Sequence, residues 1–64
     1  MANRVKLLRR SRRWTQEKLA ERASMQRSYL ADLERGYRNP SVRTLLKLAN
    51  ALGVRIRDLF EQGP

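Results

Sequence analysis

Apolar residues recur along this chain every three or four positions, which is the period of an α-helix. No strand-like alternation runs long enough to compete with that pattern. No repeat, low-complexity run or linker divides the chain, so residues 1–64 are expected to form one all-α domain. Five helices are predicted, over residues 3–12, 16–23, 27–34, 42–52 and 55–61.

Residues that suit helix ends stand between these apolar segments. Thr15 is a good N-cap for the second helix, and Ser41 holds the same place before the fourth. Gly36 and Gly53 follow the third and fourth helices, where a left-handed residue commonly ends a helix. The fifth helix lacks a good N-cap. The fourth helix is the most apolar and is expected at the centre. Its apolar residues are Val42, Leu45, Leu46, Leu48, Ala49 and Leu52, and in the first helix Val5 and Leu8 stand three positions apart. The residues expected to face inward in the other helices are Leu19, Ala20, Ala23, Leu30, Leu33 and Leu59.

The charge of the chain is strongly positive. Fifteen Lys and Arg residues stand against six Asp and Glu, which gives a formal net charge of +9. Only Lys6, Lys18 and Lys47 are lysines, so the basic residues are mostly arginines, whose planar fork fits phosphate oxygens and guanine edges. Clustered arginine on a small domain is typical of a nucleic-acid-binding protein. A surface that merely aids solubility is the alternative.

Several classes of protein are disfavoured by what the chain lacks. Without cysteine or histidine there are no disulfides, no common zinc patterns, no usual general base at neutral pH and no thiol nucleophile. We therefore expect neither an enzyme nor a bound cofactor or metal. No segment approaches the about 20 apolar residues that span a bilayer, and no signal-peptide pattern follows the basic start. A cytoplasmic protein without membrane contact is expected.

Residues 16–35 have the anatomy of a helix-turn-helix, in which two short helices are joined by a tight turn. Ala20 is the small residue midway along the first helix, where a large side chain would push the crossing helices apart. An ordinary αα-hairpin is the alternative, and the positive charge favours the DNA-binding motif. Apolar residues fall where the motif requires them, at Leu19, Ala23, Met25, Leu30 and Leu33.

The chain resembles the Cro/C1-type helix-turn-helix family, which contains phage repressors, restriction–modification controller proteins and small bacterial regulators. The resemblance extends from Val5 to Phe60 without gaps, and it implies a five-helix, lambda-repressor-like DNA-binding domain with the third helix in the major groove. Arg13 and Ser24 stand where the family often has glycine. We expect Arg13 to extend the first helix, and Ser24 to be strained if its φ is positive. The similar runs are W-T-Q-E-K-L-A-E-R-A, S-Y-L-A-D-L-E-R-G-Y-R-N-P-S and L-L-K-L-A-N-A-L-G-V.

Base readers are predicted at the start of the third helix, because the N-terminal residues of a recognition helix reach base edges. Helical periodicity places Arg27, Ser28 and Asp32 on the face opposite the inward leucines. Arg27 suits guanine, Ser28 can donate or accept, and Asp32 can accept from a cytosine amino group. The alternative for Asp32 is a local ion pair with Arg35 or Arg27.

Contacts to the DNA backbone or groove need only donors and positive charge. Gln16 opens the second helix, where backbone amides can bind phosphate. Tyr29 lies either against DNA or against the fourth helix, and Arg43 is either a contact or a plain solvated charge. Arg38 is either a backbone contact or a residue that enters a narrow minor groove. The full candidate set is Arg10, Arg13, Gln16, Tyr29, Arg35, Arg38, Asn39 and Arg43.

The resemblance further implies a buried ion pair between Arg9 and Glu34, which ties the first helix to the third. One small domain reads few base pairs, so we expect a homodimer that binds double-stranded DNA at a palindromic operator, as a repressor. Ile56 and Phe60 either form the dimer interface or close the core. Two further possibilities stay open: a protein partner, as in antitoxins of this fold, and a place for these residues in a longer regulator.

Overall fold

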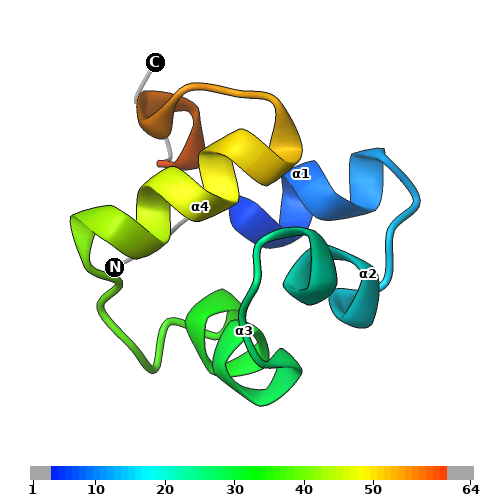
Figure 1. The fold of residues 1–64 in the computed structure, drawn as a ribbon, viewed down its shortest axis with the longest axis horizontal. Helices are drawn as coiled ribbons and strands as arrows, with labels where there is room; N and C mark the ends of the chain where they lie inside the picture. Colours follow the sequence, from blue (N-terminus) through cyan, green and yellow to red (C-terminus); the bar gives the residue numbers. More distant parts are fainter. Residues whose placement is uncertain (1–3, 61–64) are drawn as a thin grey trace.

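The computed structural model describes residues 4–60, and this part of the chain is all-helical. In Figure 1, α4 occupies the middle of the view, α1 and α2 lie toward the right, and α3 lies beneath them. Helices α1, α2 and η1 all pack against α4, while α2 packs against α3. None of these helices is long and apolar enough to cross a bilayer. The elements are α1 (Val5–Ser11), α2 (Gln16–Arg22), α3 (Arg27–Glu34), α4 (Val42–Leu52) and the 3₁₀ helix η1 (Ile56–Leu59).

The predicted ends of α3 and α4 are confirmed, and capping explains most of them. The Ser41 hydroxyl accepts the Thr44 N–H at 3.2 Å, which satisfies one of the free donors in the first turn of α4. Gly53 ends that helix with φ 71°, and Gly36 follows α3 with φ 82°. In α2 the Thr15 hydroxyl accepts the Lys18 N–H at 3.0 Å, as its cap predicts, but the helix ends at Arg22 instead of residue 23.

The predicted fifth α-helix is wrong in type, so the described chain has four α-helices and one short 3₁₀ helix. The Asp58 carboxylate accepts the Arg55 N–H at 3.1 Å and closes a single tight turn. Phe60 then returns to extended backbone, which leaves too few residues for an α-helix. The first helix is also shorter than predicted, since α1 ends at Ser11. Residues 3 and 61, the outer ends of those two predictions, lie outside the described part.

Two residues without the freedom of glycine take left-handed backbone conformations. Ser24 has φ 56° in the turn between α2 and α3, which confirms the expectation of strain there. Arg13 has φ 59°, so the expectation that it extends α1 is wrong. It forms part of the turn into α2. Such a conformation costs a non-glycine residue about 1–2 kcal/mol.

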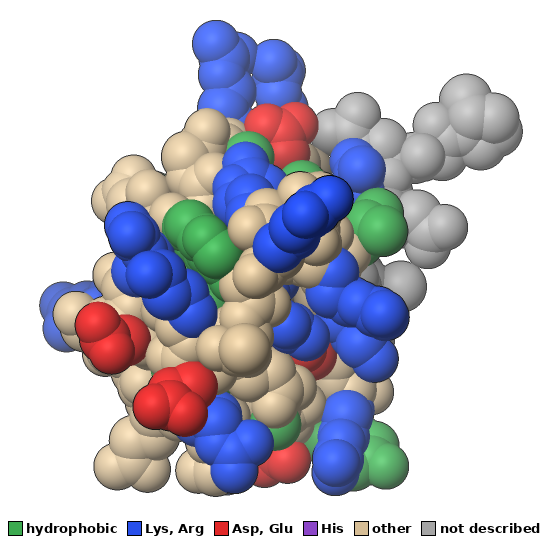
Figure 2. Space-filling view, turned by 90° about the vertical axis from the view of Figure 1, so that its right-hand side faces the viewer, with side chains coloured by type: hydrophobic (Ala, Val, Ile, Leu, Met, Phe, Trp, Pro, Cys, Tyr) green, Lys and Arg blue, Asp and Glu red, His purple; other side chains and the backbone are tan. Residues whose placement is uncertain are grey.

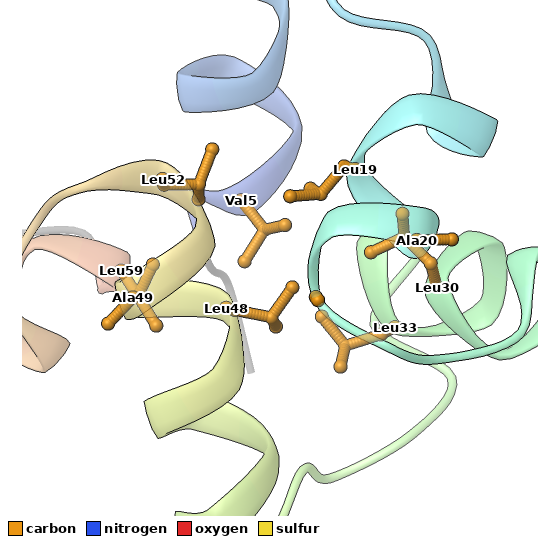
Figure 3. Packing of buried hydrophobic residues seen from close by; sticks show 10 residues of the cluster. Val5, Leu19, Ala20, Leu30, Leu33, Leu48, Ala49, Leu52 and Leu59 are labelled. Carbon is orange, nitrogen blue, oxygen red and sulfur yellow. The ribbon is translucent and has the colours of Figure 1, made fainter.

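The core gathers around α4, as Figure 3 shows with Val5 lying between Leu19, Leu48 and Leu52. Val42 and Leu46 belong to the apolar residues by which the sequence marks this helix, and they are 67% and 46% exposed. Both lie at the margin of the α4 stripe whose middle holds Leu45 and Leu52, because helical periodicity turns positions 42 and 46 toward solvent. The buried apolar residues are Val5, Leu19, Ala20, Ala23, Leu30, Leu33, Leu48, Ala49, Leu52 and Leu59.

Candidate nucleic-acid interface

The exposed side of α3 begins at its N-terminus. Gln26, Arg27 and Ser28 are exposed in succession, whereas Leu30 and Leu33 on the opposite side are completely buried. No hydrogen bond or ion pair to another of the described residues engages the side chains of Arg27 and Ser28. A rigidly packed helix therefore presents free polar side chains at the end that a recognition helix inserts into DNA.

A buried ion pair fixes the orientation of α3 against α1. Arg9 Nε donates to Glu34 Oε2 at 2.8 Å, and Nη2 donates to Oε1 at 3.1 Å, in the bidentate geometry that arginine favours. The third guanidinium nitrogen donates to the Trp14 carbonyl at 2.6 Å. The Arg9 and Glu34 side chains are only 10% and 2% exposed. This is the pair that the resemblance implies, and it leaves Arg9 little surface for a ligand.

Gln16 is held by the same network. Its side-chain amide donates to Glu34 Oε1 at 3.1 Å, so one N–H of this candidate phosphate contact is already used within the protein. A glutamine amide carries two hydrogens, and one of them remains available. The side chain thus links the buried pair to the N-terminus of α2.

A hollow of about 530 Å³ opens between the N-termini of α2 and α3. The hollow joins the exposed Arg27 guanidinium to the first residues of α2, where unpaired backbone amides favour an anion. The Arg27 guanidinium therefore lies beside a site that favours an anion. Its lining residues are Arg9, Thr15, Gln16, Glu17 and Arg27.

Asp32 forms an ion pair with neither of the two partners expected for it. Its Oδ2 lies 3.5 Å from Nε of Arg38, on the loop that follows α3. The Arg38 guanidinium also lies over the Tyr29 ring, 5.1 Å from its centroid, and Arg35 lies 5.9 Å from the ring centroid of Tyr37. Tyr29 is half-buried against the core and lines a hollow beside residues of α4, and its contact with DNA stays a prediction.

The remaining candidate contacts are exposed and lie on separate segments of the chain. Figure 2 views the molecule from the side on which α1 and α2 lie, and Lys and Arg side chains are spread over this face. Within residues 4–60 no group of three or more potential metal ligands comes together. The exposed candidates are Arg10 on α1, Arg13 in the turn before α2, Asn39 in the loop after α3, and Arg43 in the first turn of α4.

Two exposed residues were missed by the sequence analysis. Gln26 holds the N-cap position of α3, but its side chain makes no capping hydrogen bond. The Gln26 amide is therefore free at the start of α3. Because glutamine is a poor N-cap residue, the sequence could have indicated that this side chain stays available. Tyr37 is 74% exposed. Its position as an aromatic residue among arginines in a loop could have indicated that Tyr37 is exposed.

The predicted dimer-interface residues are only partly accessible. Ile56 and Phe60 are half-buried and pack against the core, and Leu59 between them is completely buried. Among residues 4–60, the large apolar side chains with the greatest exposure lie elsewhere, on Leu7, Tyr37, Val42 and Leu46.

Comparison with known proteins gives matches along most of the chain. The model of the helix-turn-helix family matches residues 5–59. The immunity repressor protein of Bacillus phage phi105 is 48% identical over 56 residues, which are 88% of this chain and 39% of that protein. The curated relatives are longer than this chain, which covers between 39% and 61% of the length of four of them.

Solved structures have the same fold. The restriction-modification controller protein C.AhdI from Aeromonas hydrophila is 44% identical with a TM-score of 0.86, over 89% of this chain and 86% of that one. SinR of Bacillus subtilis, a master regulator for biofilm formation solved in complex with DNA, is 34% identical with a TM-score of 0.80, over 84% and 87% of the two chains.

Proposed function

Because the chain belongs to the Cro/C1-type helix-turn-helix family, we propose that it binds double-stranded DNA in a sequence-specific manner and acts as a transcriptional repressor. The observation that carries the proposal is the free, exposed start of α3, held in place by the buried pair of Arg9 and Glu34. The names of similar proteins support it, since they include a phage immunity repressor and a regulator solved with DNA.

In this proposal α3 enters the major groove and its first residues read bases. Arg27 donates two hydrogen bonds to guanine, and Ser28 contacts a neighbouring base edge. Gln26 joins them, because its exposed amide has the donor and acceptor that pair with adenine.

Phosphate contacts surround this helix. The second amide hydrogen of Gln16 and the backbone amides that open α2 bind one phosphate. The exposed side chains on flanking segments neutralise others without reading sequence. The proposed flanking contacts are Arg10, Arg13, Arg35, Asn39 and Arg43.

We further propose a homodimer on a palindromic operator, with Ile56 and Phe60 at the interface. The part of each side chain that stays exposed supports this assignment. Because both residues also pack against the core, the proposed interface is small. Two copies related by a twofold axis place their recognition helices about 34 Å apart, one turn of DNA.

Selection of bound duplexes from a random DNA pool tests the proposal. The expected product is an inverted repeat whose half-sites lie about one helical turn apart. An asymmetric single site would contradict the homodimer but keep specific binding. A pool that stays random through the selection would contradict sequence-specific binding itself.

A further inference from the structure

The loop after α3 turns back onto that helix. The Gly36 N–H donates to the Leu33 carbonyl at 3.1 Å, and the Tyr37 N–H donates to the Asp32 carbonyl at 2.9 Å. This pair of bonds is the Schellman closure that follows many helices. It places Arg38, the next residue, beside the last turns of α3.

The Arg38 side chain then has two partners, both on α3. Its Nε lies 3.5 Å from the Asp32 carboxylate, and its guanidinium lies over the Tyr29 ring at 5.1 Å from the centroid. Its side chain is nevertheless 54% exposed. No hydrogen bond to another described residue engages the Arg38 guanidinium, so its N–H groups remain able to donate to an external oxygen.

Asp32 is an acidic group on the side of α3 where DNA is proposed to bind. An unpaired carboxylate there would repel the phosphates of DNA. Pairing with Arg38 offsets that charge and at the same time holds the guanidinium against α3. In this position the guanidinium lies against α3 and does not extend away from it toward a minor groove.

We propose that Arg38 is a phosphate ligand held at the edge of the recognition helix, and that Asp32 is the residue that positions it and is not a base reader. The inference rests on the proposed DNA binding, and it refines the roles of two residues within that site. Tyr29 supports the arrangement with its ring, from a half-buried position between α3 and α4.

A double-mutant cycle on Asp32→Asn and Arg38→Ala tests the proposal, with affinities measured on the selected duplex and on a scrambled one. Arg38→Ala should weaken binding more when Asp32 is present than in the Asp32→Asn background, because it leaves the carboxylate unpaired beside DNA. The expected coupling is about two- to fivefold, typical of an exposed ion pair, and equal on both duplexes. The matched control is Arg35→Ala, since Arg35 lies over Tyr37 and not beside Asp32.

The Arg38 Nε–H signal in the NMR spectrum of the free protein supplies a second readout. It should move on Asp32→Asn and stay in place on Arg35→Ala. An unmoved signal, or a cycle without coupling, would overturn the positioning role. Loss of affinity on the selected duplex alone after Asp32→Asn would make Asp32 a base reader. If the unmodified chain bound neither duplex, the proposed function itself would fall, which is a different outcome from these.

Discussion

Arg27 is the first residue of α3, and its exposed side chain has no partner among the described residues. A bidentate arginine–guanine contact discriminates against the wrong base by about 1–3 kcal/mol. Arg27→Ala should therefore weaken binding to the selected duplex by that amount and relax preference at one position in each half-site. Arg35→Ala, the matched phosphate contact, should weaken both duplexes equally. Equal losses for Arg27→Ala in titrations of both duplexes would make Arg27 a phosphate ligand in the hollow beside α2.

Ser24 is strained by its φ of 56° and is exposed in the turn between α2 and α3. Glycine adopts this conformation freely, so Ser24→Gly should raise the free energy of unfolding by about 0.5–1 kcal/mol after the greater entropy of the unfolded glycine is counted. In thermal melts this gain corresponds to a rise of about 2–8 °C for a domain of this size. Ser24→Ala keeps the strain and should bring no rise. A lower midpoint for the glycine variant would contradict the strain.

The sequence indicated the strain at Ser24, but it predicted neither the left-handed turn at Arg13 nor the partner of Asp32. The resemblance to families with glycine at position 24 marked Ser24 correctly. The sequence did not predict the pairing of Asp32 with Arg38, because that contact depends on how the loop turns back onto α3. The hydrogen bond from the Tyr37 N–H to the Asp32 carbonyl fixes that turn. Nor was Gln26 identified from the sequence; its side chain makes no capping hydrogen bond at the start of α3.

At the scale of elements, α1 and α3 are joined by the ion pair of Arg9 and Glu34. Arg9→Met or Glu34→Leu alone should lower the free energy of unfolding by about 3–5 kcal/mol, because each leaves a buried charge unpaired. The double variant should recover much of the loss, since apolar side chains fill the same space. Denaturant titrations measure this. Arg38→Ala, which breaks an exposed pair, is the control and should cost no more than about 1 kcal/mol. Single variants as stable as that control would contradict the role of the buried pair.

Helices with clear ends were predictable as elements, and the short C-terminal one was not. Ser41 and Gly53 mark α4 in the sequence and bound it in the structure. No comparable cap stands before Ile56, and a 3₁₀ helix of four residues is too short for periodicity to distinguish from an α-helix. Val42 and Leu46 continue the apolar pattern of α4, but they lie at the margin of its inward stripe and are exposed. Apolar character alone does not show on which side of that margin a residue lies.

At the scale of the whole molecule, the proposed dimer depends on a small apolar surface. Phe60→Ala should weaken self-association in sedimentation experiments and leave the melting midpoint close to that of the unmodified chain. Leu46→Ala removes a more exposed apolar side chain outside the proposed interface. It should change neither self-association nor the melting midpoint. Unfolding of the Phe60 variant would assign Phe60 to the core. Weaker association of the Leu46 variant would move the interface to the first turns of α4.

The net charge of +9 and the exposed start of α3 make separable contributions to DNA binding, since charge sets affinity for any sequence and base contacts set preference. The most direct test is equilibrium titration of the unmodified chain against the selected and the scrambled duplex, from about 50 to 200 mM salt. If a dimer neutralises about 6–8 phosphates, the logarithm of the affinity should fall with the logarithm of salt concentration at a slope of about −5 to −7. The selected duplex should bind at least about 10³-fold more tightly. Equal affinity for the two duplexes at every salt concentration, or no binding to either, would contradict sequence-specific DNA binding by this protein.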